Sequence, residues 1–387
     1  MQNIHITDTI QYVGTDDREI DLFESQYIVP NGVSYNSYII LDEKIAVMDG
    51  VDERAEKAWF QNLEKALDGK TPDYLVVSHL EPDHAGNMQK FMEKYPQAQL
   101  VVNAKALSML PQFFTLDMSA RSVVVKEGDE LNLGSHVLTF VMAPMVHWPE
   151  VMVSYEKTDK VLFSADAFGK FGALDTEEDW SCEARRYYFN IVGKYGMQVQ
   201  ALLKKASALD IRIICPLHGP VLSENQDFYL GKYQLWSSYE PEDEGILIAY
   251  ASIHGNTGKA AEKLAELLRE KGAGKVVVSD LAREDMAEVI EDAFRYDRMV
   301  LAAATYDAGI FPCMDSFLSR LKSKNYQKRT VGLIENGSWA PMAGKVMKES
   351  LSQLKEVTLL EPVVTIKSTL NESSMEQLEQ LAQALVK

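Results

Sequence analysis

The sequence predicts an α/β protein with two domains in series, a layered αββα sandwich followed by a doubly wound parallel sheet. Its 387 residues suffice for two domains, at roughly 100–200 residues each. An acidic segment interrupts the secondary-structure pattern near residue 240, and the pattern differs on its two sides. The length, the interruption and the change of pattern together predict the two domains.

The interruption is the segment Tyr239–Gly245, with the sequence Tyr-Glu-Pro-Glu-Asp-Glu-Gly. It is acidic, it contains Pro241, and it ends in glycine, as linkers between domains often do. We therefore expect one domain over residues 1–244 and a second over residues 245–387.

The first region is dominated by β-like runs. Two of them, Val151–Tyr155 and Lys160–Ser164, flank a short polar turn and predict a hairpin. Helical patterns at Glu53–Leu67 and Gln198–Ala208 interrupt the runs. Strand runs mixed with helices in this order favour a layered αββα domain. The other predicted strands are Ser37–Leu41, Lys44–Met48, Tyr74–Ser78, Leu100–Asn103 and Val137–Met142.

The second region alternates strictly between strands and helices, which is typical of a doubly wound parallel sheet. The first unit shows the pattern: strand Ile246–Tyr250 precedes an apolar helix face that includes Ala260, Leu264 and Leu268. The later predicted strands are Val276–Val278, Met299–Ala303, Thr330–Ile334 and Leu359–Ile366, and the helices between and after them are Ala287–Phe294, Asp315–Leu321, Lys345–Leu354 and Met375–Val386.

Charge and composition exclude several classes of protein. The net charge of −18 argues against nucleic acids and anionic membrane surfaces as partners, because like charges repel. Cys182, Cys215 and Cys313 are widely spaced with no C-x-x-C pair, so a disulfide framework is not expected. No apolar run approaches the ~20 residues of a membrane span, and the N-terminus lacks the pattern of a secretory signal. We therefore expect a soluble cytoplasmic protein.

Four side chains able to bind a metal fall within six residues after the predicted strand Tyr74–Ser78. They are His79, Glu81, Asp83 and His84. The intervening Pro82 cannot continue a strand and is expected to keep the segment a loop. Three further candidates follow other β-like runs: His147, Asp166 and His218. Because each follows a strand, the strand ends could bring all seven together.

Seven ligands predict a site for two metal ions. Two histidines and one carboxylate are a common set for non-haem iron. His79, Glu81 and His147 would make one set, and Asp83, His84 and His218 the other. Asp166 remains, and its two oxygens could bridge ions that lie ~3.5–4 Å apart. The anionic ligands favour a redox-active iron pair over a zinc pair.

The second region carries a predicted phosphate site after its first strand. Hydroxyls, backbone N–H groups and a helix N-terminus converge there, as they do around bound phosphates. The motif is neither that of ATP-binding loops nor that of dinucleotide-binding folds, so a mononucleotide is favoured. Two more loops, at Thr305–Pro312 and Glu335–Pro341, contribute aromatic side chains and glycines suited to a flavin ring. The predicted flavin-binding residues are Ser252, Ile253, His254, Gly255, Asn256, Thr257, Thr305, Tyr306, Ala308, Gly309, Asn336, Gly337, Ser338, Trp339 and Ala340.

With these motifs the chain resembles a flavodiiron protein (A-type flavoprotein), in which a metallo-β-lactamase-like domain precedes a flavodoxin-like domain. The family pattern is similar to H-x-E-x-D-H followed by H, D and H. Here 62 residues separate His84 from His147, 18 separate His147 from Asp166, and 51 separate Asp166 from His218. The segment S-x-H-G-N-T is similar to flavodoxin phosphate loops, except that His254 stands where Ser or Thr is usual.

The resemblance implies FMN in the second domain and two irons, a di-iron centre, in the first. It implies reduction of O2 to water and/or of NO to N2O, with electrons from a donor such as rubredoxin. That donor would be a separate protein, because the sequence has no paired C-x-x-C motifs. It also implies a head-to-tail homodimer or a dimer of dimers. Tyr195 would line the substrate pocket as a catalytic residue, with simple packing on a helix as the alternative.

Two other functions are compatible with parts of the pattern. A binuclear zinc hydrolase could use the same fold, but such enzymes resemble H-x-H-x-D-H, and here the second position is Glu81. An electron carrier or redox sensor could hold a purely structural metal, but structural sites tend to be closed. Asp49 is a candidate partner for the histidines, whereas Trp148 and Tyr155 are expected to be core residues.

Overall fold

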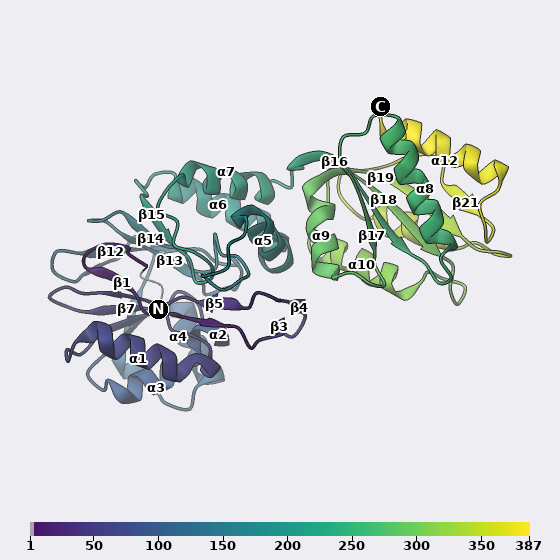
Figure 1. The fold of residues 1–387 in the computed structure, drawn as a ribbon. Coiled ribbons are helices and arrows are strands. Elements are labelled where there is room, and N and C mark those ends of the chain that lie inside the picture. Colours follow the sequence, from purple (N-terminus) through teal and green to yellow (C-terminus); the bar gives the residue numbers. More distant parts are fainter. Residues whose placement is uncertain (1–3) are drawn as a thin grey trace. The chain divides into compact units, whose positions relative to one another are not determined.

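The computed structural model describes residues 4–387 and divides into two compact units (Figure 1). One unit contains the chain up to Tyr188 and Met197–Gln234, and the other contains Phe189–Gly196 and Leu235–Lys387. Within residues 4–387, no helix has both the length and the apolarity that crossing a membrane requires. The boundary at residue 244 stays a prediction.

The N-terminal unit is built on two sheets. The first contains, in spatial order, β1 (Ile10–Tyr12), β6 (Tyr38–Ile40), β7 (Ala46–Met48), β8 (Tyr74–Val76), β9 (Gln99–Asn103) and β10 (Ser122–Val125). The second contains β11 (Glu130–Asn132), β12 (Val137–Met142), β13 (Met152–Glu156), β14 (Val161–Phe163) and β15 (Ile213–Cys215). Strands β7 to β10 run parallel, and the predicted hairpin is present as the antiparallel pair β13 and β14.

The core of this unit lies between the sheets. Tyr38 and Val76 of the first sheet join Phe140 and Phe163 of the second in one buried apolar cluster. Because side chains alternate along a strand, the other face of the second sheet meets a helix instead. Val141 of β12 and Leu203 of α6 (Gly196–Ala206) line the same small apolar space there.

Helices cover both outer faces, so the predicted αββα sandwich is confirmed. Figure 1 shows α1 and α3 beyond the first sheet and α6 and α7 beyond the second. Helix α2 begins at Pro82, so the expectation of a loop there was wrong: proline favours the first turn of a helix, where no N–H partner is needed. The helices of this unit are η1 (Glu53–Ala55), α1 (Glu56–Leu67), α2 (Pro82–Ala85), α3 (Met88–Lys94), α4 (Ala104–Phe113), η2 (Ser119–Arg121), α5 (Trp180–Tyr187), α6 and α7 (Gln226–Ser237). The short helices η3 (Tyr188–Val192) and η4 (Gly193–Tyr195) fall almost entirely in the segment Phe189–Gly196, which belongs to the other unit.

Two small antiparallel pairs complete the N-terminal unit. Strand β2 (Thr15–Asp17) pairs with β5 (Val33–Tyr35). Strand β3 (Leu22–Phe23) pairs with β4 (Tyr27–Ile28). The second pair matters for the site, because its Phe23 packs against one of the predicted metal ligands.

The C-terminal unit is a parallel sheet with helices on both faces, as the alternating pattern predicts. Its strands follow the order β17 (Val276–Asp280), β16 (Asp243–Ala251), β18 (Tyr296–Ala304), β19 (Arg329–Asn336) and β20 (Val357–Leu359), and β21 (Val364–Ile366) also pairs with β19. Helices α8 (Asn256–Glu270) and α12 (Glu372–Leu385) share one buried apolar cluster on one face. The remaining helices are α9 (Met286–Arg295), α10 (Pro312–Ser323) and α11 (Ala343–Leu351).

Two element boundaries differ from the prediction. The expected strand Leu359–Ile366 is divided into β20 and β21, because Pro362 lies between them and lacks the N–H that a sheet needs. Strand β16 begins at Asp243, so the last three residues of the expected linker are part of a strand.

Candidate metal centre and flavin edge

The predicted metal ligands all lie a few residues beyond the C-terminal ends of strands. His79 follows β8, His147 follows β12, Asp166 follows β14 and His218 follows β15. Glu81 precedes the short helix α2, which presents Asp83 and His84 in consecutive positions. Strands of both sheets therefore contribute to one point in the N-terminal unit.

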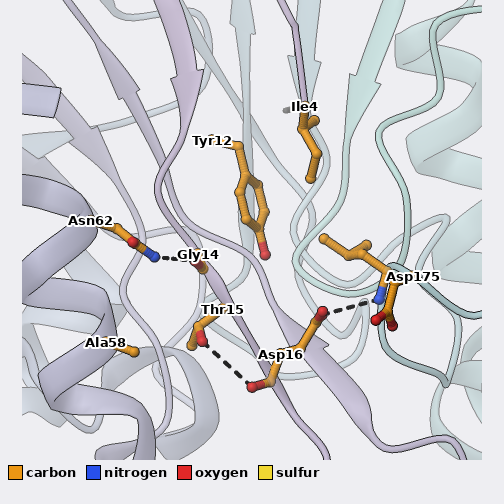
Figure 2. Close-up of a pocket in the computed structure, with 9 residues that line it drawn as sticks. Ile4, Tyr12, Gly14, Thr15, Asp16, Ala58, Asn62 and Asp175 are labelled. Carbon is orange, nitrogen blue, oxygen red and sulfur yellow. Dashed lines mark hydrogen bonds between the residues drawn. The ribbon is translucent and has the colours of Figure 1, made fainter. Parts of the chain in front are cut away.

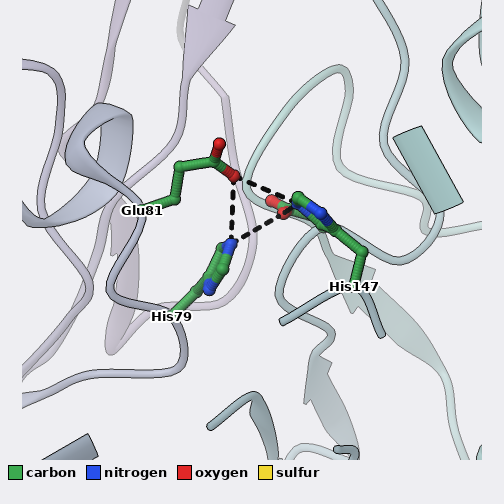
Figure 3. A group of neighbouring side chains, drawn as sticks. His79, Glu81 and His147 are labelled. Atoms are coloured by element: carbon green, nitrogen blue, oxygen red, sulfur yellow. Dashed lines mark hydrogen bonds and ion pairs between the residues drawn. The ribbon is translucent and has the colours of Figure 1, made fainter. Parts of the chain in front are cut away.

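The structure brings the seven side chains together in two groups. In the first, Glu81 Oε2 lies 3.1 Å from His79 Nε2 and 3.0 Å from His147 Nε2 (Figure 3). In the second, Asp83 Oδ2 lies 3.4 Å from His84 Nε2 and 3.3 Å from His218 Nε2. Each group is compact enough for its side chains to share one ion.

Asp166 joins the two groups. Its Oδ2 lies 3.5 Å from His79 Nε2 and 3.1 Å from His147 Nε2. Its Oδ1 lies 3.1 Å from His84 Nε2 and 3.8 Å from His218 Nε2. One oxygen thus faces each group, which is the arrangement of a carboxylate that bridges two ions.

The chemistry of these side chains fits metal ions. Several ligand atoms are buried without a hydrogen-bond partner among residues 4–387, an arrangement that costs roughly 1–3 kcal/mol for each group when nothing else compensates. A cation shared by the cluster would satisfy all of them at once, and imidazole with carboxylate suits iron. The atoms are Asp83 Oδ1 and Oδ2, His84 Nε2, Asp166 Oδ1 and His218 Nε2.

The charges of the cluster support the same conclusion. Burial raises the pKa of Asp166, but the hydrogen bond to His147 and the charges of His79 and His84 outweigh burial and hold that pKa well below its usual value. Burial lowers the pKa of His147, but its bonds to Asp166 and Glu81 raise that pKa to about 9. Asp166 is therefore ionised, as a metal ligand must be, and a metal must displace the proton from His147.

Two histidines are oriented through their outer ring nitrogens. His79 Nδ1 donates to Glu150 Oε1 at 2.8 Å, and His218 Nδ1 donates to the carbonyl oxygen of Ser34 at 2.7 Å. Asp49 instead accepts from the backbone N–H of Ser78 at 2.6 Å, so it positions the segment before His79. Asp49, the predicted partner of the histidines, is thus hydrogen-bonded to the backbone near His79 and not to a histidine ring.

Aromatic side chains surround the histidines. The rings of Phe23, Tyr35 and Tyr187 lie 5.4, 6.0 and 5.5 Å from the ring of His218. Trp148 lies edge-on to His79 at 5.1 Å and is only partly buried, so it belongs to the site rather than to the core as expected. Tyr155 is buried in the core, as predicted.

Sequence reasoning missed Glu150 and Tyr187. The carboxyl group three residues after His147 was a signal for Glu150, but nothing in the Arg-Arg-Tyr-Tyr-Phe segment distinguishes Tyr187 from its neighbour. Tyr195 lies in η4, half-buried, with the Lys194 ammonium 5.7 Å from its ring centroid. The catalytic role of Tyr195 stays a prediction.

A separate cavity of about 610 Å³ also opens in the N-terminal unit (Figure 2). Tyr12, Asp16, Asn62 and Asp175 line it, and Asn62 Nδ2 donates to the carbonyl oxygen of Gly14 at 2.8 Å. None of the predicted site residues lines this cavity, so it is distinct from the candidate metal centre.

In the C-terminal unit, the predicted flavin residues lie on three loops at one edge of the sheet. The loops follow β16, β18 and β19, which are neighbours in the sheet. Gly255 adopts a positive φ of 89°, which favours glycine, and its N–H donates to Ser252 Oγ at 3.0 Å. Thr305 Oγ1 accepts from the N–H of Met342 at 2.9 Å, so the second and third loops are tied together.

This edge fits a flat ring with a phosphate. Each loop exposes one large apolar side chain: Ile253 at 39%, Tyr306 at 45% and Trp339 at 93%. Such exposed apolar side chains at one edge mark a ligand or partner surface. The 15-residue helix α8 begins beside them at Asn256 and directs its free N–H groups toward the same loop.

Comparison with known families matches both units. Residues 33–219 match the family described as ODP family beta lactamase, and residues 247–371 match a flavodoxin domain. The chain is 30% identical over 349 residues to the anaerobic nitric oxide reductase flavorubredoxin of Aliivibrio salmonicida, covering 87% of this chain and 69% of that protein. It is 29% identical to an uncharacterised protein of Methanocaldococcus jannaschii, covering 91% and 90%.

Solved structures resemble the whole chain. The rubredoxin oxygen:oxidoreductase of Desulfovibrio gigas superposes with a TM-score of 0.91 at 27% identity, covering 98% of both chains. A flavo di-iron protein variant from Thermotoga maritima superposes with a TM-score of 0.88 at 25% identity, covering 97% of this chain and 95% of the other.

Proposed function

Because this chain belongs to the flavodiiron protein family, we propose that it receives electrons through FMN and reduces O2 to water, NO to N2O, or both, at a pair of irons. The protein is an oxidoreductase with a metallo-β-lactamase-like domain and a flavodoxin-like domain. The single observation that carries the proposal is the pair of ligand groups that share the two oxygens of Asp166.

We assign one iron to His79, Glu81 and His147, and the other to Asp83, His84 and His218, with Asp166 between them. The irons would supply the redox chemistry that reduction of O2 or NO requires, and FMN would supply electrons. The chain's own contribution is orientation and exclusion of water. The rings of Phe23, Tyr35 and Tyr187 pack around His218 and limit the approach of bulk solvent.

We assign FMN to the edge formed by the three loops of the C-terminal unit. Ser252, Asn256 and Thr257, with the N–H groups at the start of α8, would hold the phosphate. Tyr306 and Trp339 would contact the flavin ring, because both are exposed aromatic side chains on loops at the same edge.

We also propose a rubredoxin-type electron donor, a homodimer or dimer of dimers, and a cytoplasmic location. The relative from Desulfovibrio gigas is named for rubredoxin, which supports a donor of that type. None of the three cysteines forms a disulfide bond within residues 4–387, which agrees with a reducing compartment.

The test is metal and flavin content followed by turnover. Protein purified without chelator should contain about two iron and one FMN per chain, and after reduction it should consume O2 or NO. Two zinc with no flavin would contradict the proposal and favour a hydrolase. FMN with iron but with no consumption of either gas would leave an electron carrier as the better account.

A further inference from the structure

Glu150 is a buried carboxylate in contact with a predicted metal ligand. Only 1% of its surface is exposed. Its Oε1 accepts from His79 Nδ1 at 2.8 Å and from the backbone N–H of Leu80 at 2.9 Å. Glu150 therefore forms hydrogen bonds with both the imidazole of His79 and the backbone of Leu80, at the start of the H-x-E-x-D-H motif.

The position of Glu150 is fixed by a rigid part of the fold. Asn103 Nδ2 donates to the carbonyl oxygen of Glu150 at 2.6 Å, and Asn103 Oδ1 caps α4 by accepting from the N–H of Ala106 at 2.9 Å. Glu150 also immediately precedes Val151, whose N–H bonds the carbonyl oxygen of Trp148. Its carboxylate is thus held in place by contacts outside the ligand set.

The contact fixes how His79 faces the centre. Because a carboxylate only accepts, Nδ1 of His79 carries a proton, and Nε2, which faces Glu81 and Asp166, is the nitrogen that would bind an ion. The second oxygen of Glu150, Oε2, is buried with no hydrogen-bond partner in the part of the chain that the structure describes. The donors that face this carboxylate are the imidazole of His79 and the backbone N–H of Leu80, so the side chain on which its negative charge acts is that of His79.

The histidines of the second ligand group have no comparable support. His218 Nδ1 meets a neutral carbonyl oxygen, and His84 Nδ1 is buried without a hydrogen-bond partner among the residues that the structure describes. A carboxylate behind a ligating histidine raises its basicity and strengthens the metal bond. The two predicted metal positions therefore differ in the group that accepts a hydrogen bond from the outer ring nitrogen of their histidines.

We propose that Glu150 is a positioning residue that makes the two metal positions unequal. By its contact with His79 it strengthens metal binding at the His79–Glu81–His147 position and favours the oxidised ion there. The inference rests on the proposed function only in taking the ligand set as a di-iron centre. It assigns the lower reduction potential to the iron at that position.

The test replaces the charge and keeps the shape. Glu150→Gln retains an oxygen that accepts from His79 and Leu80 but removes the negative charge. In the full chain, we expect one of two Co²⁺ sites to weaken by about 10–100-fold, measured by equilibrium dialysis, with the other unchanged. In the iron-loaded protein, the more negative of the two iron potentials should move to a more positive value, followed by electron paramagnetic resonance of the mixed-valent form.

A matched control comes from the same domain. Glu156 is fully buried on β13, and its Oε1 lies 3.1 Å from Nδ1 of His136; with Asp159 these two residues form a third compact group, separate from both ligand groups. Glu156→Gln makes the same chemical change and should leave both Co²⁺ affinities and both iron potentials as in the wild type. Glu150→Asp keeps the charge but shortens the reach, and should lose less than Glu150→Gln in both measurements.

Two results would overturn the inference. One is a Glu150→Gln protein, folded by circular dichroism, with wild-type Co²⁺ affinities and iron potentials. The other is an equal change in Glu156→Gln. If Glu150→Gln does not fold, the Glu150→Asp protein decides, since wild-type values there despite the shortened contact would also refute a positioning role. Co²⁺ binding needs neither FMN nor turnover, so a lack of reductase activity would count against the proposed function alone.

Discussion

The candidate metal centre is made of buried polar side chains, whereas the flavin edge is made of exposed apolar ones. His79, His84 and Asp166 are almost fully buried and contact one another directly. Tyr306 and Trp339 extend from loops into solvent. Buried charges are tolerated only when they are paired or bound to metal. The stability of the metal centre should therefore depend on its ion far more than the stability of the flavin edge depends on FMN.

The largest effect is expected at the residue that both ligand groups share. Asp166→Ala should abolish binding of both metal ions, a loss of more than about 100-fold in affinity, because Oδ1 faces one group and Oδ2 the other. FMN content should be unchanged. Metal analysis and flavin absorbance measure the two outcomes. Asp210→Ala, at an exposed carboxylate of the same unit, is the control, and two retained metals in Asp166→Ala would contradict the bridging assignment.

The second prediction concerns pH and the metal-free protein. Since the folded pKa of His147 is about 9 against 6.5 ordinarily, its charged form stabilises the fold fully below about pH 6.5. That contribution should disappear as pH rises through 9, lowering the free energy of unfolding by roughly 3 kcal/mol at most. Urea unfolding of the chelated protein at several pH values measures it. His147→Gln should flatten the profile, and an equally steep profile in that variant would refute the assignment.

A smaller effect is expected at the flavin edge. Trp339→Ala removes an aromatic contact with the flavin ring, worth about 0.5–1.5 kcal/mol, or up to tenfold in FMN affinity. Because Trp339 is 93% exposed, the melting temperature of the FMN-free protein should not change. Fluorescence titration with FMN measures the affinity. Phe228→Ala, at another exposed aromatic residue, should bind FMN as the wild type does. Unchanged FMN binding in Trp339→Ala would argue against the proposed contact.

The smallest expected effect concerns the backbone of the phosphate loop. Gly255→Ala places a side chain at a φ of 89°, at a cost of about 1 kcal/mol, although the added Cβ meets no atom within 4 Å. FMN affinity should fall about fivefold through the backbone alone. Gly274→Ala, where the Cβ is also unobstructed and φ is not positive, is the matched control. Equal affinities in the two variants would show that the loop conformation does not matter for binding.

Prediction from the sequence succeeded where local pattern carries the information. The five βα units of the second region and the hairpin of the first follow from periodicity, and the structure has them. The prediction failed where a single proline alters the type or the bounds of a secondary-structure element. Pro82 begins helix α2, and Pro362 divides the last predicted strand. In both places the proline was visible, but its effect depended on the neighbouring elements.

The sequence by itself determined which side chains stand at the strand ends, because strand periodicity and the spacing of H-x-E-x-D-H are properties of the local chain. Only the tertiary structure decided which oxygen of Asp166 faces which group, that Tyr187 packs on His218, and that Glu150 stands behind His79. Those contacts join segments far apart in the chain. They are set by how the two sheets and their loops pack together, which no local pattern contains.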